Sequence, residues 1–364
     1  MRPGETFLKL ACVLHRAWRR QHPRPDTPRV LAIVSNTALG DTLLSTPVVA
    51  SARASFPDAR ILFLVHPRYE ALFAGLPGVD ALLTYDGGYR QLLPTVAALR
   101  RQRVDTVLLA HSNGPQDIAL GCLSNAATLL KPATRSPLAG FLTTQMPPEE
   151  RHVIEARCAL GRQLGGQRIH TRMILPPRYF GDLPPQLPRL PLPAIGFQLG
   201  AANHYKMWPL KNFAALARQL LARRPEAHIV LTGSPAERAL AHSLIASVQD
   251  ARIVDHTGKH AVEDLPWLLR QLSVLVTNDT GPMHLAIALG IPTVCLFGMT
   301  SSRLIGPYQD PDKHIVLQSP LEGAELHLPK KQRSNRAMTA ISVDAVAAAV
   351  CKLLEMHHAH PAHH

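Results

Sequence analysis

Short runs of β-branched and other apolar residues alternate with amphipathic stretches of helical period from Arg29 onward. This alternation limits the possible folds more than any other feature of the sequence. In the first half, four runs predict strands over 30–35, 60–65, 80–85 and 105–110, and a helix is expected over about 41–54. Strand–helix alternation is typical of βαβ units on a parallel sheet.

The chain changes character between Pro176 and Pro193, where seven of eighteen residues are proline. Neither a helix interior nor a central strand tolerates so much proline, so we predict a stiff, extended linker. Alternation then resumes, and the strands expected in the second half cover 194–200, 227–233, 252–258, 273–279 and 292–298.

A chain of 364 residues is long enough for two domains of ordinary size. The predicted fold is α/β, with two Rossmann-like, doubly wound parallel-sheet domains facing a central cleft. The predicted parts are a basic N-terminal segment, a first domain, the linker, a second domain, a closing helix and a His-rich tail, over 1–28, 29–175, 176–193, 194–340, 341–356 and 357–364.

The charge balance predicts an anionic partner. Lys and Arg (39) exceed Asp and Glu (26), which gives a net charge of +13. Aromatic residues make up only 5%, and no basic stripe interleaved with aromatics is present, so we expect no nucleic acid. Phosphorylated ligands and anionic lipid are the better candidates.

The five cysteines are scattered without a C-x-x-C pair, which favours a reducing compartment without a disulfide framework. Cys295 lies in an apolar run and is expected to be buried. The sequence contains no run of 18 apolar residues, so no membrane span is predicted. The N-terminus lacks the basic start, apolar core and cleavage site, in that order, of a signal peptide. We therefore expect a cytoplasmic protein.

The N-terminal stretch "FLKLACVLHRAWRR" predicts a basic amphipathic helix. One face carries the apolar residues Phe7, Leu10, Ala11, Leu14, Ala17 and Trp18. Such a helix can lie on an anionic bilayer, which predicts peripheral attachment to a membrane. The alternative is a helix that packs on its own domain and keeps its basic side in water.

Three predicted strand ends carry unusual polar residues. Asp41 follows the first strand, and the second strand end is followed by Lys206 in "HYKMWPLKNF". The third runs through Asn278 and Asp279 into a helix that begins near Pro282. Ligands of open parallel sheets bind outside the carboxyl ends of the strands, so these residues are the candidates for function.

The third strand end predicts a phosphate site. Thr280 is a candidate helix cap, Gly281 permits close approach of a ligand, and Pro282 suits a first turn. The free N–H groups at a helix N-terminus attract phosphate, and Lys206 is placed to reach a diphosphate. An ordinary βα turn and a solvated lysine are the alternatives.

For Asp41, the alternatives are a helix cap and a catalytic carboxylate. No spacing of ligand residues predicts a metal site.

Three motifs together resemble glycosyltransferase family 9, the heptosyltransferases of lipopolysaccharide assembly. They are "LGDTLLSTP", "KMWPLKNFAAL" and "NDTGPMHLAIALGIPTVCLFGMTSS". The resemblance implies a GT-B fold that binds acceptor on the N-terminal domain and nucleotide sugar on the C-terminal domain. It also implies inversion without a metal or other cofactor, with ADP-L-glycero-β-D-manno-heptose as donor and a lipid-linked lipopolysaccharide core or related glycan as acceptor.

The resemblance also implies roles for individual residues. Asp41 matches the proposed general base, and Lys206 the lysine that meets the diphosphate. The remaining matches belong to donor binding and are Asp279, Thr280, Gly281, His284 and, more loosely, Gly298 and Thr300. Lys211 departs from the family, where a Glu is common, and is expected on the outer side of a helix.

Two alternatives remain open from the sequence. One is a transferase of the same fold that uses another nucleotide sugar. The other is a non-catalytic nucleotide-sugar-binding protein, which has no need of Asp41.

Overall fold

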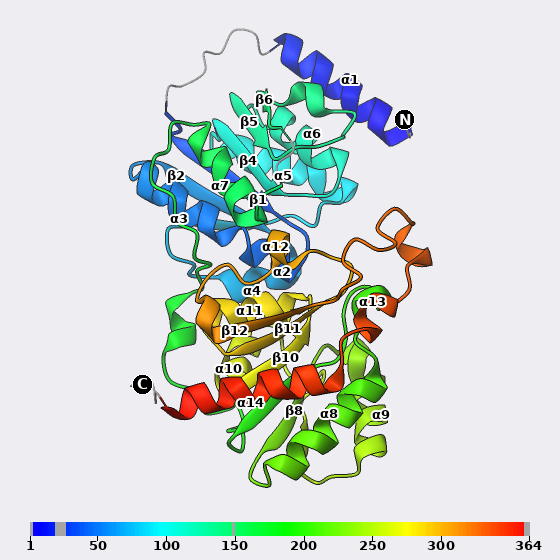
Figure 1. Ribbon diagram of the computed structural model, residues 1–364. Helices are drawn as coiled ribbons and strands as arrows, with labels where there is room; N and C mark the ends of the chain where they lie inside the picture. The colour runs from blue at the N-terminus through cyan, green and yellow to red at the C-terminus, as the bar shows by residue number, and fades with distance from the viewer. Residues whose placement is uncertain (1–2, 19–26, 148–149, 360–364) are drawn as a thin grey trace. The chain divides into compact units, whose positions relative to one another are not determined.

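The computed structural model describes residues 3–18, 27–147 and 150–359. The rest of the predicted N-terminal segment and residues 360–364 of the His-rich tail lie outside this part. The chain divides into two compact units between Arg178 and Tyr179, a point within the proline-rich stretch (Figure 1).

The first unit is built on a six-stranded parallel sheet in the order β3-β2-β1-β4-β5-β6. Its strands are β1 (Val30–Ser35), β2 (Arg60–Val65), β3 (Ala81–Thr84), β4 (Thr106–His111), β5 (Thr128–Lys131) and β6 (Thr144–Gln145). Its helices are α1 (Pro3–Trp18), α2 (Leu39–Leu43), α3 (Thr46–Ser55), α4 (Glu70–Phe73), α5 (Tyr89–Arg101), α6 (Pro115–Leu123) and α7 (Val153–Arg162).

The second unit repeats this strand order as β9-β8-β7-β10-β11-β12. Its strands are β7 (Ala194–Gln198), β8 (His228–Thr232), β9 (Ile253–Asp255), β10 (Val274–Asn278), β11 (Thr293–Phe297) and β12 (His314–Gln318). Its helices are α8 (Leu210–Arg223), α9 (Arg238–Val248), α10 (Leu265–Arg270), α11 (Gly281–Leu289), α12 (Ser302–Ile305), α13 (Arg336–Thr339) and α14 (Val343–Ala359).

Helices on both faces of each sheet explain why the strands are apolar throughout. Every residue of β7, β10 and β11 is buried, which is the pattern of parallel strands covered on both sides. Alternate residues of the central strands, such as Val274 and Val276, pack into one core with α8 and α14. The predicted class of fold, two doubly wound parallel-sheet units, is confirmed.

The helix predicted over 41–54 is wrong as a single element. The structure has α2 and then α3, because Pro47 in the first turn of α3 cannot continue a helix from the preceding turn. The short strands β5, β6 and β12 were not predicted. Cys295 is fully buried, as expected, and Lys211 is exposed on α8.

The predicted N-terminal helix is present as α1, which packs against α6. The face expected to be apolar does not make this contact: Phe7, Leu10 and Leu14 are exposed, whereas Leu8 and Cys12 are buried. The alternative of a helix that packs on its own unit is therefore confirmed, although another face than the predicted apolar one makes the contact. Within the described residues, no helix is long and apolar enough to cross a bilayer.

Candidate functional site

The polar strand-end residues lie at the same topological position in both units. In each sheet the strand order reverses between the two central strands, β1 and β4 in one and β7 and β10 in the other. Asp41 follows β1, and Lys206 and Asp279 follow β7 and β10. Ligands of doubly wound sheets bind at this switch point.

Asp41 does not cap its helix. It is the third residue of α2, whose N-cap is Ala38 and carries no side-chain capping bond, so the capping interpretation is wrong. The Asp41 carboxylate is instead held by two side chains from other elements, Arg157 of α7 and His111 at the end of β4. The Asp41 side chain is 30% exposed, so one side of the carboxylate is open to solvent.

Arg157 is the cation that fixes Asp41. Its side chain is 5% exposed, and its guanidinium donates to Oδ1 of Asp41 at 2.9 Å and to the main-chain oxygen of the same residue at 2.6 Å. It also donates to Oγ of Ser45 at 3.0 Å. Charge-assisted bonds of this kind set the direction of a carboxylate as well as its charge.

His111 completes the arrangement as a neutral ring. Burial lowers the pKa of His111 to about 4, and the neighbouring Arg157 adds to the effect while Asp41 opposes it. Nδ1 of His111 lies 3.0 Å from an Arg157 nitrogen, which has only hydrogens to offer, so Nδ1 accepts. The proton is then on Nε2, 3.3 Å from Oδ2 of Asp41. His111 therefore holds Asp41 and has no free lone pair to act as a base.

In the second unit, Lys206 and Asp279 form an ion pair. Nζ of Lys206 lies 2.5 Å from Oδ2 of Asp279, which also accepts a hydrogen bond from Oγ1 of Thr300 at 3.1 Å. The Asp279 side chain is 6% exposed and that of Lys206 is 20% exposed. The lysine is thus fixed from its buried side and partly open on the other.

Asn278 and Trp208 build the loop that carries Lys206. The buried amide of Asn278 donates to the carbonyls at the end of β7, including that of Leu199 at 3.0 Å, and accepts from the main-chain N–H of Trp208 at 3.0 Å. The Trp208 ring is buried, packs edge-on against Phe213, and donates through Nε1 to the carbonyl of Ile341. These contacts anchor the loop that carries Lys206 to the core of the second unit.

The N-terminus of α11 lies directly after Asp279. Thr280 is the N-cap residue, but its hydroxyl makes no capping bond and lies 3.3 Å from that of Thr277, so its predicted capping by the side chain is wrong. The first-turn N–H groups at Gly281 and Met283 are therefore not satisfied by the cap side chain, which suits an anion at this end of the helix. His284 is buried in the same first turn.

The loop after β11 contributes Gly298 and Thr300. Thr300 contacts Asp279 as described. Gly298 is explained by packing, because a Cβ there would lie 2.7 Å from Sδ of Met338 on α13.

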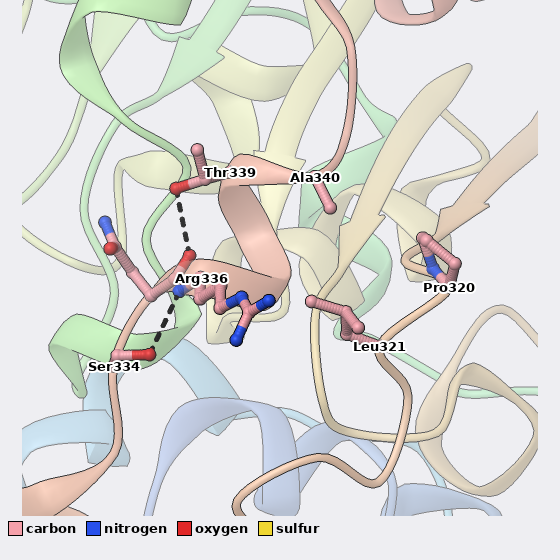
Figure 2. A pocket seen from close by; sticks show the side chains of 7 residues that line it. Pro320, Leu321, Ser334, Arg336, Thr339 and Ala340 are labelled. Atoms are coloured by element: carbon pink, nitrogen blue, oxygen red, sulfur yellow. Dashed lines mark hydrogen bonds between the residues drawn. The ribbon is translucent and has the colours of Figure 1, made fainter.

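An open groove of about 590 Å³ lies beside α13 (Figure 2). It is lined by Pro320, Leu321, Ser334, Asn335, Arg336, Thr339 and Ala340. None of the residues predicted to bind the donor lines this groove. Among the described residues, no group of three or more His, Cys, Asp or Glu side chains is arranged to hold a metal ion.

The sequence reasoning missed His111 and Arg157. His111 had a usable signal, since it directly follows the strand predicted over 105–110, just as Asp41 follows the first predicted strand. Arg157 had a weaker one, a single arginine within the apolar stretch of a helix, "VIEARCALG", which indicates a buried charge with a partner elsewhere.

Comparisons with known proteins show which family the chain belongs to. The model of glycosyltransferase family 9 (heptosyltransferase) matches residues 146–334, just over half of the chain. The chain belongs to glycosyltransferase family 9. It is a glycosyltransferase, and the resemblance found in its sequence motifs is confirmed.

Relatives span nearly the whole chain. Lipopolysaccharide heptosyltransferase 3 of Escherichia coli is 24% identical over 335 residues, which cover 86% of this chain and 96% of the relative. Lipopolysaccharide heptosyltransferase 2 of Salmonella typhimurium is 34% identical over 119 residues, about a third of each chain (32% and 34%). The E. coli ADP-heptose lipopolysaccharide heptosyltransferase II structure superposes with a TM-score of 0.71 at 21% identity, covering 91% of this chain and 99% of that one. The fold is therefore GT-B.

Proposed function

We propose that this glycosyltransferase moves a heptose from ADP-L-glycero-β-D-manno-heptose to a hydroxyl of a lipid-linked lipopolysaccharide core or related glycan. The reaction inverts the anomeric carbon, needs no metal or other cofactor, and takes place at the cytoplasmic face of the inner membrane. The names of the relatives, lipopolysaccharide heptosyltransferases, support the heptose and the acceptor class. The single observation that carries the proposal is the Lys206–Asp279 pair beside the N-terminus of α11.

The second unit has the chemistry to receive a sugar–diphosphate. As the bond between the anomeric carbon and the diphosphate breaks, negative charge grows on the leaving nucleotide. Lys206 and the first-turn N–H groups of α11 are fixed before the reaction, so they stabilise this charge with little reorganisation. A lysine and a helix dipole can thus do the work that a divalent cation does elsewhere.

The first unit has the chemistry to activate an acceptor. The acceptor oxygen attacks the anomeric carbon, its proton passes to the Asp41 carboxylate, and ADP leaves from the opposite side. Arg157 and His111 act as positioning residues, because both contact the Asp41 carboxylate, and the Asp41 side chain is still 30% exposed. The nearest alternative is the same reaction with another nucleotide sugar.

A donor panel tests the proposal. Purified protein is incubated with truncated lipopolysaccharide core acceptor and ADP-heptose, or with UDP- and GDP-hexoses, and the released nucleotide and the anomeric configuration of the product are measured. We expect release of ADP alone, an inverted product and full activity in EDTA. Release of only UDP or GDP would overturn the heptose donor, and a requirement for added Mg²⁺ would overturn the metal-free mechanism.

The role of Asp41 has its own test. Asp41→Asn keeps the size of the side chain and its ability to accept from Arg157, but removes the base. We expect donor binding by calorimetry within about twofold of wild type and a loss of transfer of about 10²–10⁴-fold. Unchanged transfer would remove Asp41 from the reaction.

A further inference from the structure

The helix α1 is fixed on the first unit by one face only. Leu8 and Cys12 belong to the core of this unit, and the main-chain oxygen of Cys12 lies 3.8 Å from Sγ of Cys122 on α6. Near the end of the helix, Arg16 donates to the carbonyl of Gly140 at 2.8 Å. Figure 1 shows α1 lying along α6 at the edge of the first unit.

The opposite face of α1 carries four large apolar side chains in water. These side chains are between 47% and 71% exposed and belong to Phe7, Leu10, Val13 and Leu14. With 100° between successive residues, they fall on one side of the helix, facing away from Leu8 and Cys12. Single exposed apolar residues are common on protein surfaces, but a cluster on one helix face indicates a partner.

The charges around this face indicate what the partner is. Lys9 is exposed at its border, Glu5 is the only acidic residue of α1, and the sequence continues with Arg19 and Arg20. A second copy of the chain would bring these like charges together. An anionic lipid surface instead offers hydrocarbon to the apolar face and phosphates to the basic border.

We propose that the outer face of α1 docks on an anionic bilayer. Phe7, Leu10, Val13 and Leu14 enter the boundary between headgroups and acyl chains, and Lys9 contacts lipid phosphates. The helix lies in the plane of the surface and stays attached to the first unit through Leu8 and Cys12. Asp41 belongs to the same unit, so docking holds the unit that carries the proposed base at the lipid surface.

Vesicle co-sedimentation of the full-length protein tests this proposal without donor or acceptor, so its result is independent of the proposed function. Vesicles contain phosphatidylcholine alone or with 30 mol% phosphatidylglycerol. We expect binding to the mixed vesicles and a drop in the partition coefficient of about 100-fold for Phe7→Ser/Leu10→Ser/Leu14→Ser. The matched control is Phe180→Ser/Leu93→Ser/Leu192→Ser, which removes one exposed Phe and two exposed Leu elsewhere.

A second readout does not depend on the triple variant. In Phe7→Trp, tryptophan emission is expected to shift to the blue when mixed vesicles are added, whereas Leu93→Trp is expected to show no added shift. Lys9→Glu is expected to weaken binding to the mixed vesicles.

The proposal is overturned if the wild-type protein does not co-sediment with the mixed vesicles. It is also overturned if the triple variant binds them as well as its matched control does. A wild-type dimer in light scattering that becomes a monomer in the triple variant, without vesicle binding, identifies a second copy as the occupant and also overturns it.

Discussion

The ion pair between Lys206 and Asp279 allows stability and catalysis to be separated by a double-mutant cycle. The variants are Lys206→Met, Asp279→Asn and the combination. Asp279→Asn keeps an oxygen that accepts from Thr300, so it removes the charge and little else. Lys206→Met keeps most of the length of the side chain and removes the ammonium.

The expected coupling follows from the geometry of the pair. Two unit charges 4 Å apart at an effective dielectric constant of 20 attract by about 4 kcal/mol, and Nζ and Oδ2 are closer than that. Desolvation of the nearly buried Asp279 opposes much of this attraction, so we expect a coupling free energy of about 1–3 kcal/mol. Lys206→Met alone should lower the free energy of unfolding by about 2–3 kcal/mol, because it strands a buried carboxylate.

Catalysis should behave differently from stability. The double variant has no stranded charge, so its unfolding midpoint should recover towards wild type. Its kcat should stay about 10²–10³-fold low, as in Lys206→Met, because the cation at the leaving diphosphate is still missing. Thermal unfolding and ADP release measure the two quantities on the same samples.

Lys211→Met is the matched control for this cycle, since Lys211 is exposed on α8 five residues away. It should change unfolding by less than about 0.5 kcal/mol and leave kcat unchanged. If the double variant regains most of its activity, then Lys206 serves only to neutralise Asp279, and the electrostatic role assigned to it is refuted.

Three further predictions concern buried side chains of the two units. Arg157→Lys cannot reach the oxygens of Asp41 and Ser45 together, so kcat should fall about 10–100-fold with little change in donor KM; an unchanged kcat in ADP-release assays would contradict this. Burial lowers the pKa of His314 to about 4, so the unfolded state binds more protons between pH 4 and 6.5 and stability should rise with pH across that window. This contribution is at most about 3 kcal/mol, and urea unfolding of His314→Leu should show a weaker pH dependence than wild type. Trp208→Ala should destabilise the second unit by about 3–5 kcal/mol, measured by urea unfolding, because a fully buried ring is lost.

The sequence predicted the layout of both units because parallel strands covered on both sides leave a strong local signal. Runs such as 30–34 and 274–276 are apolar throughout and are followed by polar residues at the end of the strand. The strands β5 and β6 have only four and two residues, too few to leave a local signal. The missed strand β12, "HIVLQ", has the same apolar run as the predicted strand β8, "HIVLT", so it was readable from the sequence. Pro47 indicates a break between α2 and α3, but the apolar pattern continues across it and led to the prediction of a single helix.

The candidate site was predictable as far as strand ends identify it. Asp41, Lys206 and Asp279 all directly follow central strands or the turns after them. The partner of Asp41 was not predictable in the same way, since Arg157 is 116 positions away and only the tertiary fold brings α7 to β1. The face of α1 that packs on the first unit was also not predicted. Leu8 and Cys12 lie outside the apolar face that the amphipathic pattern indicated.

The two units use one topology with opposite signs of charge. At the switch point of the first, a buried cation, Arg157, fixes a more exposed anion, Asp41; in the second, a buried anion, Asp279, fixes a more exposed cation, Lys206. In each pair the buried member makes the additional hydrogen bonds or is the more enclosed, so it sets the direction of the exposed one. A proton acceptor and a stabiliser of a leaving anion need these opposite charges. The repeated strand order therefore explains where the functional groups lie, and the buried counter-charge explains why each is held in one direction before any substrate arrives.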